Sequence, residues 1–90
     1  MIGGPAESAF VLSRHALAMV VERDIDISWI ERALRHPERV EADSRDRELR
    51  HALAPIPERD GRVLRVVYNE TTVPWRIVTA YFDRTQRNKQ

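Results

Sequence analysis

Cysteine is absent from this 90-residue chain, and lysine occurs only once, at position 89. Without cysteine, the chain can form neither a disulfide framework nor a thiolate metal site. Its apolar runs all fall well short of the roughly 20 residues that a membrane-spanning helix needs. The first residues also lack the charged and apolar regions of a secretory signal. We therefore expect a cytoplasmic protein that does not enter a membrane.

The composition favours one compact core beneath a strongly charged surface. Apolar residues make up 42% of the chain and charged residues 32%, and this length is typical of one domain. A Gly-Gly-Pro sequence near the start opposes regular structure. We expect a flexible leader over residues 1–8, a single domain over 9–84 and a frayed, basic tail over 85–90.

Two short helices are predicted in the first half of the chain. Ser13 is a good N-cap for the first, over residues 14–23. The second is expected over residues 29–35, because Ser28 and the glutamate three residues later form a capping-box pattern, and a proline follows at position 37. Apolar residues at helical spacing predict the buried stripe of the first helix, which is formed by Ala16, Leu17, Val20 and Val21.

β-Branched and aromatic residues dominate residues 61–82, which predicts a β-hairpin with an Asp-Gly turn in front of it. Pro55 and Pro57 should end the preceding strand or confine it to a sheet edge. The fold class that follows is α+β in the order β-α-α-β-β-β-β, with two helices packed on one face of a small antiparallel sheet. The expected strands cover residues 9–12, 38–43, 49–56, 62–69 and 75–82.

Both hairpin strands are apolar on two sides and carry arginines. One side should pack on the helices, and we expect the other to be covered by a partner or lined by the arginines. Arg65 and Arg76 lie on neighbouring strands, where their forked donors could hold one phosphate. The anion between them could equally be Glu22 or an acid from a partner, so the pair could also form an internal salt bridge.

The three histidines, His15, His51 and His36, could transfer protons near neutral pH. Tyr81 is a further site candidate and lies with Arg84 at the end of the last strand. His15 follows the first N-cap and could instead lock its helix onto the sheet through Glu22 or a strand carbonyl. His51 alternates with leucines, which also suits a half-buried sheet residue. The third histidine, His36, better suits a role at the end of a helix, where an imidazolium favours the dipole.

Positive charge gathers in the last third of the chain. From Arg59 onward there are seven cations and three acids, although the whole chain carries a net charge of only +1. Phosphate-binding or RNA-binding candidates are Arg23, Arg62, Arg84 and Arg87. The sequence contains no nucleotide-binding fingerprint and no zinc-ligand spacing, so we expect no cofactor and no metal.

Several short motifs stand in a fixed order: SRHA at 13–16, ERDI at 22–25, GRVLRVV at 61–67 and IVTAY at 77–81. This set resembles a small bacterial domain-of-unknown-function family with the pattern S-x-H-A…E-R-G-I…G-R-x-L-x-V-V. That family is similar to BrnT-type toxins and to the RelE/ParE toxin superfamily. Asp24 stands where the family prefers glycine.

The resemblance implies a compact, RelE/BrnT-like α+β fold, metal-independent RNA cleavage and a cognate antitoxin that covers the active face. The catalytic candidates would then be His15, His51, Arg65, Arg76 and Tyr81. The alternative is a non-catalytic module in which the same face binds a partner protein or a second copy of the chain.

Overall fold

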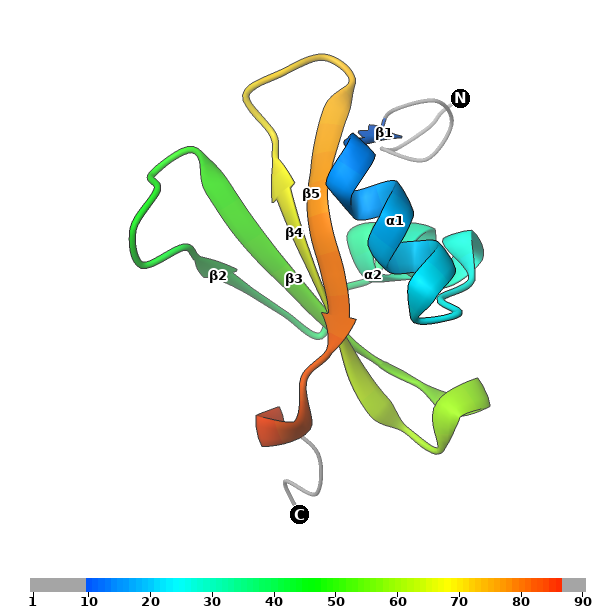
Figure 1. The fold of residues 1–90 in the computed structure, drawn as a ribbon. Coiled ribbons are helices and arrows are strands. Elements are labelled where there is room, and N and C mark those ends of the chain that lie inside the picture. Colours follow the sequence, from blue (N-terminus) through cyan, green and yellow to red (C-terminus); the bar gives the residue numbers. More distant parts are fainter. Residues whose placement is uncertain (1–9, 87–90) are drawn as a thin grey trace.

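Two helices lie against one face of a five-stranded sheet (Figure 1). The computed structural model describes residues 10–86, so the expected leader over residues 1–8 and the end of the tail lie outside the described residues. The expected α+β class and element order are confirmed. The elements are β1 (Phe10–Leu12), α1 (Arg14–Glu22), α2 (Ile27–Arg35), β2 (Arg39–Ala42), β3 (Leu49–Ile56), the 3-10 turn η1 (Pro57–Arg59), β4 (Arg62–Asn69), β5 (Trp75–Phe82) and the 3-10 turn η2 (Arg84–Gln86).

The strand order is β1-β5-β4-β3-β2, and all neighbours are antiparallel except β1 and β5, which run parallel. The sheet is therefore mixed, whereas we expected an antiparallel one. The first strand joins the sheet beside the last, where the amide of Ser13 donates to the carbonyl of Ile77 at 2.9 Å. Because β1 pairs only with residues 75–77, the second half of β5 forms a sheet edge.

The three long strands have the bounds that the sequence predicts. Pro55 lies inside β3 but obeys the edge rule locally, because β2 begins opposite Leu53 and the part of β3 beyond Leu53 has no partner on that side. Between β4 and β5 the register shifts. Val67 pairs with Thr79 and Tyr68 with Ile77, which leaves one extra residue, Val78, as a bulge in β5.

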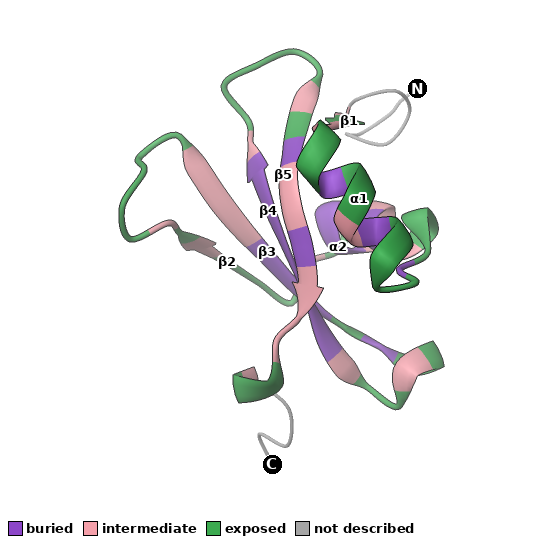
Figure 2. Cartoon of the chain, viewed as in Figure 1, coloured by how far each residue is buried: buried purple, intermediate pink, exposed green. Residues whose placement is uncertain are grey.

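Ser13 caps α1 as predicted, and its Oγ accepts a hydrogen bond from the amide of Ala16 at 3.0 Å. Half of the predicted stripe is wrong, because Leu17 and Val21 are 54% and 73% exposed while Ala16 and Val20 are buried. The helix meets the sheet mainly along β5, with fewer contacts to β1. A helix at the rim of a two-layer domain buries a narrow line of side chains and leaves the flanking positions open (Figure 2).

The N-cap of α2 is Asp26, whose Oδ1 accepts from the amide of Ser28 at 2.9 Å. The prediction that Ser28 caps this helix is therefore wrong. Aspartate and serine are equally good caps. Ile25 is buried immediately before Asp26, so the turn brings Asp26 to the N-cap position. Asp24 adopts φ 55° in this turn, a left-handed conformation that glycine prefers and aspartate tolerates.

The core lies between the helices and the sheet, where Ile30, Ile56, Leu64 and Ile77 are fully buried. The opposite face of the sheet also buries Leu53 and Val67, beside Arg65. Within residues 10–86, no helix is long and apolar enough to cross a bilayer.

Candidate nucleic-acid interface

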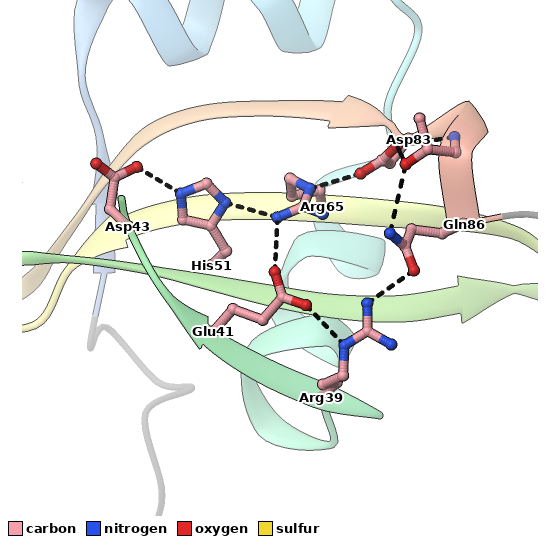
Figure 3. Close-up of polar contacts among 8 residues, drawn as sticks. Arg39, Glu41, Asp43, His51, Arg65, Asp83 and Gln86 are labelled. Carbon is pink, nitrogen blue, oxygen red and sulfur yellow. Dashed lines mark hydrogen bonds and ion pairs between the residues drawn. The ribbon is translucent and has the colours of Figure 1, made fainter. Parts of the chain in front are cut away.

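Arg65 is the centre of a charged cluster on the sheet face away from the helices (Figure 3). The residue is only 9% exposed. Its Nε donates to Oδ2 of Asp83 at 2.7 Å, and its Nη1 donates to Oε1 of Glu41 at 3.3 Å and to Nδ1 of His51 at 2.8 Å. The sequence left open whether Arg65 meets a phosphate, an acid of a partner or an acid of its own chain. Arg65 forms an internal salt bridge, with Glu41 before it and Asp83 after it in the chain.

His51 lies between Arg65 and Asp43, with its Nε2 2.7 Å from Oδ1 of Asp43. Arginine has no acceptor, so Nδ1 of His51 must accept the bond from Arg65 and Nε2–H must donate to Asp43. Both ring nitrogens are thereby occupied, and His51 has no free nitrogen for a substrate. Of the two interpretations of His51 from the sequence, the structure shows a half-buried residue of the sheet.

The charges of this cluster stabilise one another. Burial by itself would raise the pKa of Asp83, but hydrogen bonds from Thr85 and Arg65 outweigh burial and hold that pKa below its ordinary value. The same balance holds for Glu41, whose pKa is lowered by Arg39 and Arg65 against the effect of burial. Burial would lower the pKa of Arg65, but its bond to Asp83 raises that pKa.

Arg39 extends the cluster to the end of the described chain. It donates to Oε2 of Glu41 at 2.8 Å and to Oε1 of Gln86 at 2.7 Å. Residues 84–86 form the turn η2, and Asp83 accepts bonds from the amide and hydroxyl of Thr85. The expectation that the chain frays from residue 85 is therefore wrong for residues 85 and 86, because this turn is tied to β2 and β4.

The clearest pH dependence of stability should come from Asp43. Hydrogen bonds from His51 and from the Asp46 and Arg45 amides lower its pKa from 3.8 to about 2. A carboxylate with a depressed folded-state pKa stabilises the fold above its unfolded pKa, and this contribution is lost as the proton binds. We expect the free energy of unfolding to fall between pH 3.8 and about 2, as measured by urea titrations at several pH values.

Asp43→Asn should make that decline shallower, because asparagine keeps an acceptor oxygen without a titratable group. Glu48→Gln is the matched control, since Glu48 is an exposed carboxylate in the same turn. Identical pH profiles for Asp43→Asn and the unsubstituted protein would contradict the assignment.

A second feature lies at the free edge of β5 and is called the arginine groove here. It is a hollow of about 730 Å³. Four arginines from four different elements meet in it: Arg23 follows α1, Arg59 ends η1, Arg62 begins β4 and Arg84 begins η2. The lining residues are Arg23, Arg59, Arg62, Thr79, Tyr81, Phe82 and Arg84.

No carboxylate lines this groove within the described part of the chain. Arg23 donates to the carbonyl of Ala80 at 3.1 Å, and Arg62 lies over the ring of Phe82 at 5.0 Å from its centroid. Arg59 stacks on the same ring at 5.4 Å and also forms an exposed ion pair with Asp24 at 3.5 Å. Four converging cations with one acid beside them attract an anion, and forked guanidinium donors suit phosphate.

A smaller hollow of about 410 Å³, called the second hollow here, lies at the start of β5. It brings Arg76 together with Arg14 and His15, and the three side chains are exposed. His15 makes no hydrogen bond within the described residues, so it does not lock α1 onto the sheet. Ser13 and Arg23 do so instead, through the carbonyls of Val78 and Ala80.

The structure divides the predicted site residues into groups. Arg65 lies opposite Tyr81, whereas Arg76 lies opposite Asn69 at the far end of β4. The expectation that Arg65 and Arg76 could share one phosphate is therefore wrong. His51, Arg65 and Tyr81 share the face away from the helices, His15 and Arg76 share the second hollow, and Arg87 lies outside the described residues.

Three of the four predicted phosphate-binding arginines, Arg23, Arg62 and Arg84, line the arginine groove. Sequence reasoning missed Arg59 and Arg14 as members of the two hollows. The proximity of Arg59 to the hairpin was a usable signal, because η1 leads directly into β4. The acids Glu41 and Asp83 gave no such signal, since only the strand register brings them to Arg65.

The fold and these two basic hollows define a small α+β domain with an arginine-lined sheet edge. No group of three or more potential metal-ligating side chains occurs among residues 10–86. Residues 12–82 match the family described as "Domain of unknown function (DUF4258)", and the chain belongs to this family. Comparison with curated proteins finds no match. Comparison with solved structures also finds none.

Proposed function

We propose that the protein is a toxin-like domain that binds RNA in the arginine groove and cleaves it without a metal ion. The observation that carries this proposal is the convergence of Arg23, Arg59, Arg62 and Arg84 with no carboxylate among the groove residues. Tyr81 lies in the same groove and supplies both an aromatic ring and a hydroxyl. The ordered sequence motifs resemble a family that is similar to BrnT-type toxins and, through them, to the RelE/ParE superfamily, and this similarity is the second ground for the proposal.

The proposed reaction is transesterification at one phosphate. The 2′-oxygen of the RNA attacks phosphorus and gives its proton to water, while the bond from phosphorus to the 5′-oxygen breaks. Tyr81 donates a proton to that leaving oxygen, and the arginines offset the charge that develops on the phosphorane. The products are a 2′,3′-cyclic phosphate and a 5′-hydroxyl end.

A cognate antitoxin belongs to the same proposal. An acidic segment of such a protein would compete with RNA for the arginine groove, because both present anions to the same donors. Expression of the chain without its neighbour-encoded protein should then slow growth and degrade cellular RNA. Normal growth with intact RNA would count heavily against a toxin.

Binding itself is testable by fluorescence anisotropy with a short labelled RNA. Counterion release predicts a slope of log K against log salt of about −0.7 per phosphate contact for single strands. Four arginines therefore predict a slope of about −3. The double substitution Arg62→Ala/Arg84→Ala should weaken binding and reduce the magnitude of the slope by about 1.4.

Arg45→Ala/Arg47→Ala is the charge-matched control for that experiment. Arg45 and Arg47 are exposed in the turn between β2 and β3, at the opposite edge of the sheet. If the two double variants weakened binding to the same extent, only overall charge would matter, and the groove assignment would fail.

The alternative, a non-catalytic interaction module that pairs with a second copy, is favoured by one observation. Leu17 and Val21 lie one turn apart on α1 and are 54% and 73% exposed, so two copies could pack these ridges together. The hairpin face that the sequence suggested for this role is instead occupied by the Arg65 cluster. Light scattering distinguishes the two models. A dimer that Val21→Glu dissociates, without RNA binding at low salt, would favour the module.

A further inference from the structure

The two basic hollows lie next to each other along β5. Val78 lines the second hollow, and the next residue, Thr79, lines the arginine groove. The bulge at Val78 lies at the junction between them. The stretch of β5 from Arg76 to Phe82, which contributes to both hollows, is called the track here.

The two ends of α1 lie beside the two ends of this track. Arg14 and His15 belong to its first turn and line the second hollow, while Arg23 follows its last residue and lines the arginine groove. Figure 1 shows α1 beside β5, and two side-chain bonds hold it there, from Ser13 to Val78 and from Arg23 to Ala80. The spacing between the two sets of cations is thus set by regular elements and not by loops.

We propose that a single strand of RNA with stacked bases lies along β5 and contacts both hollows, an inference that rests on the proposed function. The track runs from Arg76 to Phe82, a length of about 20 Å at roughly 3.3 Å per strand residue. At about 3.4 Å per stacked nucleotide, this length accommodates about six nucleotides, and fewer if the strand is stretched. One phosphate can occupy one hollow, but a longer strand is needed to reach the other.

A single strand fits this surface better than a duplex. Proteins that recognise duplex RNA by shape contact about 16 base pairs, a far longer surface than this track. Single-strand sites combine a cationic groove with aromatic side chains on which bases stack. Tyr81 is partly exposed in the groove, and the exposed guanidinium groups of Arg14 and Arg76 offer further stacking planes.

The test is a length series of labelled oligouridylates with two, four, six and eight nucleotides, measured by anisotropy at one salt concentration. Affinity should rise steeply until both hollows are occupied, at about six nucleotides, and then level off. The double variant Arg14→Ala/Arg76→Ala should bind the dinucleotide like the unsubstituted protein but lose most of the gain with length. Its salt slope on the hexamer should be smaller in magnitude by about 1.4.

Arg14 and Arg76 are exposed and make no ion pair within the described residues, so the double variant should fold. Circular dichroism checks this, and Arg45→Ala/Arg47→Ala again controls for charge. The track would be disproved by affinity that does not depend on length, by equal losses for short and long strands, or by equal binding of a six-base-pair duplex. Binding of the dinucleotide would still support the proposed function in each case, whereas no RNA binding at all would end both proposals.

Discussion

Replacing Arg65 with alanine should destabilise the protein by about 3–5 kcal/mol, the usual cost of removing one partner of a buried ion pair. The side chains of Arg65 and Asp83 are only 11% and 10% exposed, and their atoms are 2.7 Å apart. Without the guanidinium, the Asp83 carboxylate would remain desolvated and Nδ1 of His51 would lose its donor. A domain with a total stability of about 5–15 kcal/mol would lose a large part of it.

The measurement is urea unfolding followed by circular dichroism. Arg39→Ala is the matched control, because Arg39 also contacts Glu41 but is 43% exposed, and such surface pairs contribute about 0–1 kcal/mol. The double substitution Arg65→Ala/Asp83→Ala should be less destabilising than the sum of the two single changes, since it removes both charges. A loss below about 1 kcal/mol for Arg65→Ala would show that the cluster is not a buried ion pair.

Replacing Tyr81 with phenylalanine should lower the rate of RNA cleavage by about 10²–10⁴-fold, the usual contribution of a positioned general acid. Phenylalanine keeps the ring and removes the hydroxyl, so RNA affinity should change little. The readout is single-turnover cleavage of an end-labelled RNA, with binding measured on the same substrate. Identification of 2′,3′-cyclic phosphate ends would confirm the proposed reaction.

Tyr68→Phe is the control for that experiment, because Tyr68 is buried and stacks on Trp75 at 5.1 Å, outside both hollows. His15→Gln tests the other exposed candidate, in the second hollow. Loss of cleavage in His15→Gln with full cleavage in Tyr81→Phe would move the proton donor to the second hollow. Cleavage that persists in both variants would refute a role for either group.

Local signals in the sequence predicted the strands well and the helix contacts less well. Strands 62–69 and 75–82 are rich in β-branched side chains, and strand 49–56 alternates and ends at prolines, so the limits of all three are locally determined. Helical spacing shows which residues share a stripe, but the width of the buried part depends on the neighbouring layer. Leu17 and Val21 were misplaced because α1 packs at the rim of the sheet.

The site was less predictable because it depends on register. Arg65 and Asn69 are four positions apart along β4. The strand register places Tyr81 opposite Arg65 and Arg76 opposite Asn69, so Arg76 lies far from Arg65. Sequence reasoning could identify the arginines as phosphate-binding candidates from their type. It could not show that Glu41 and Asp83 neutralise Arg65, or that no carboxylate lines the arginine groove.

The bond between Arg65 and Asp83 also bears on where the folding unit ends. The family match stops at residue 82, yet the carboxylate that neutralises the buried guanidinium belongs to the next residue, and Gln86 bonds to Arg39 on the far strand. A shortened chain that ended at the family boundary would keep every strand but lose the counter-ion of its most buried charge. We therefore expect the folding unit to extend to residue 86, a few positions beyond the limit that the family similarity marks.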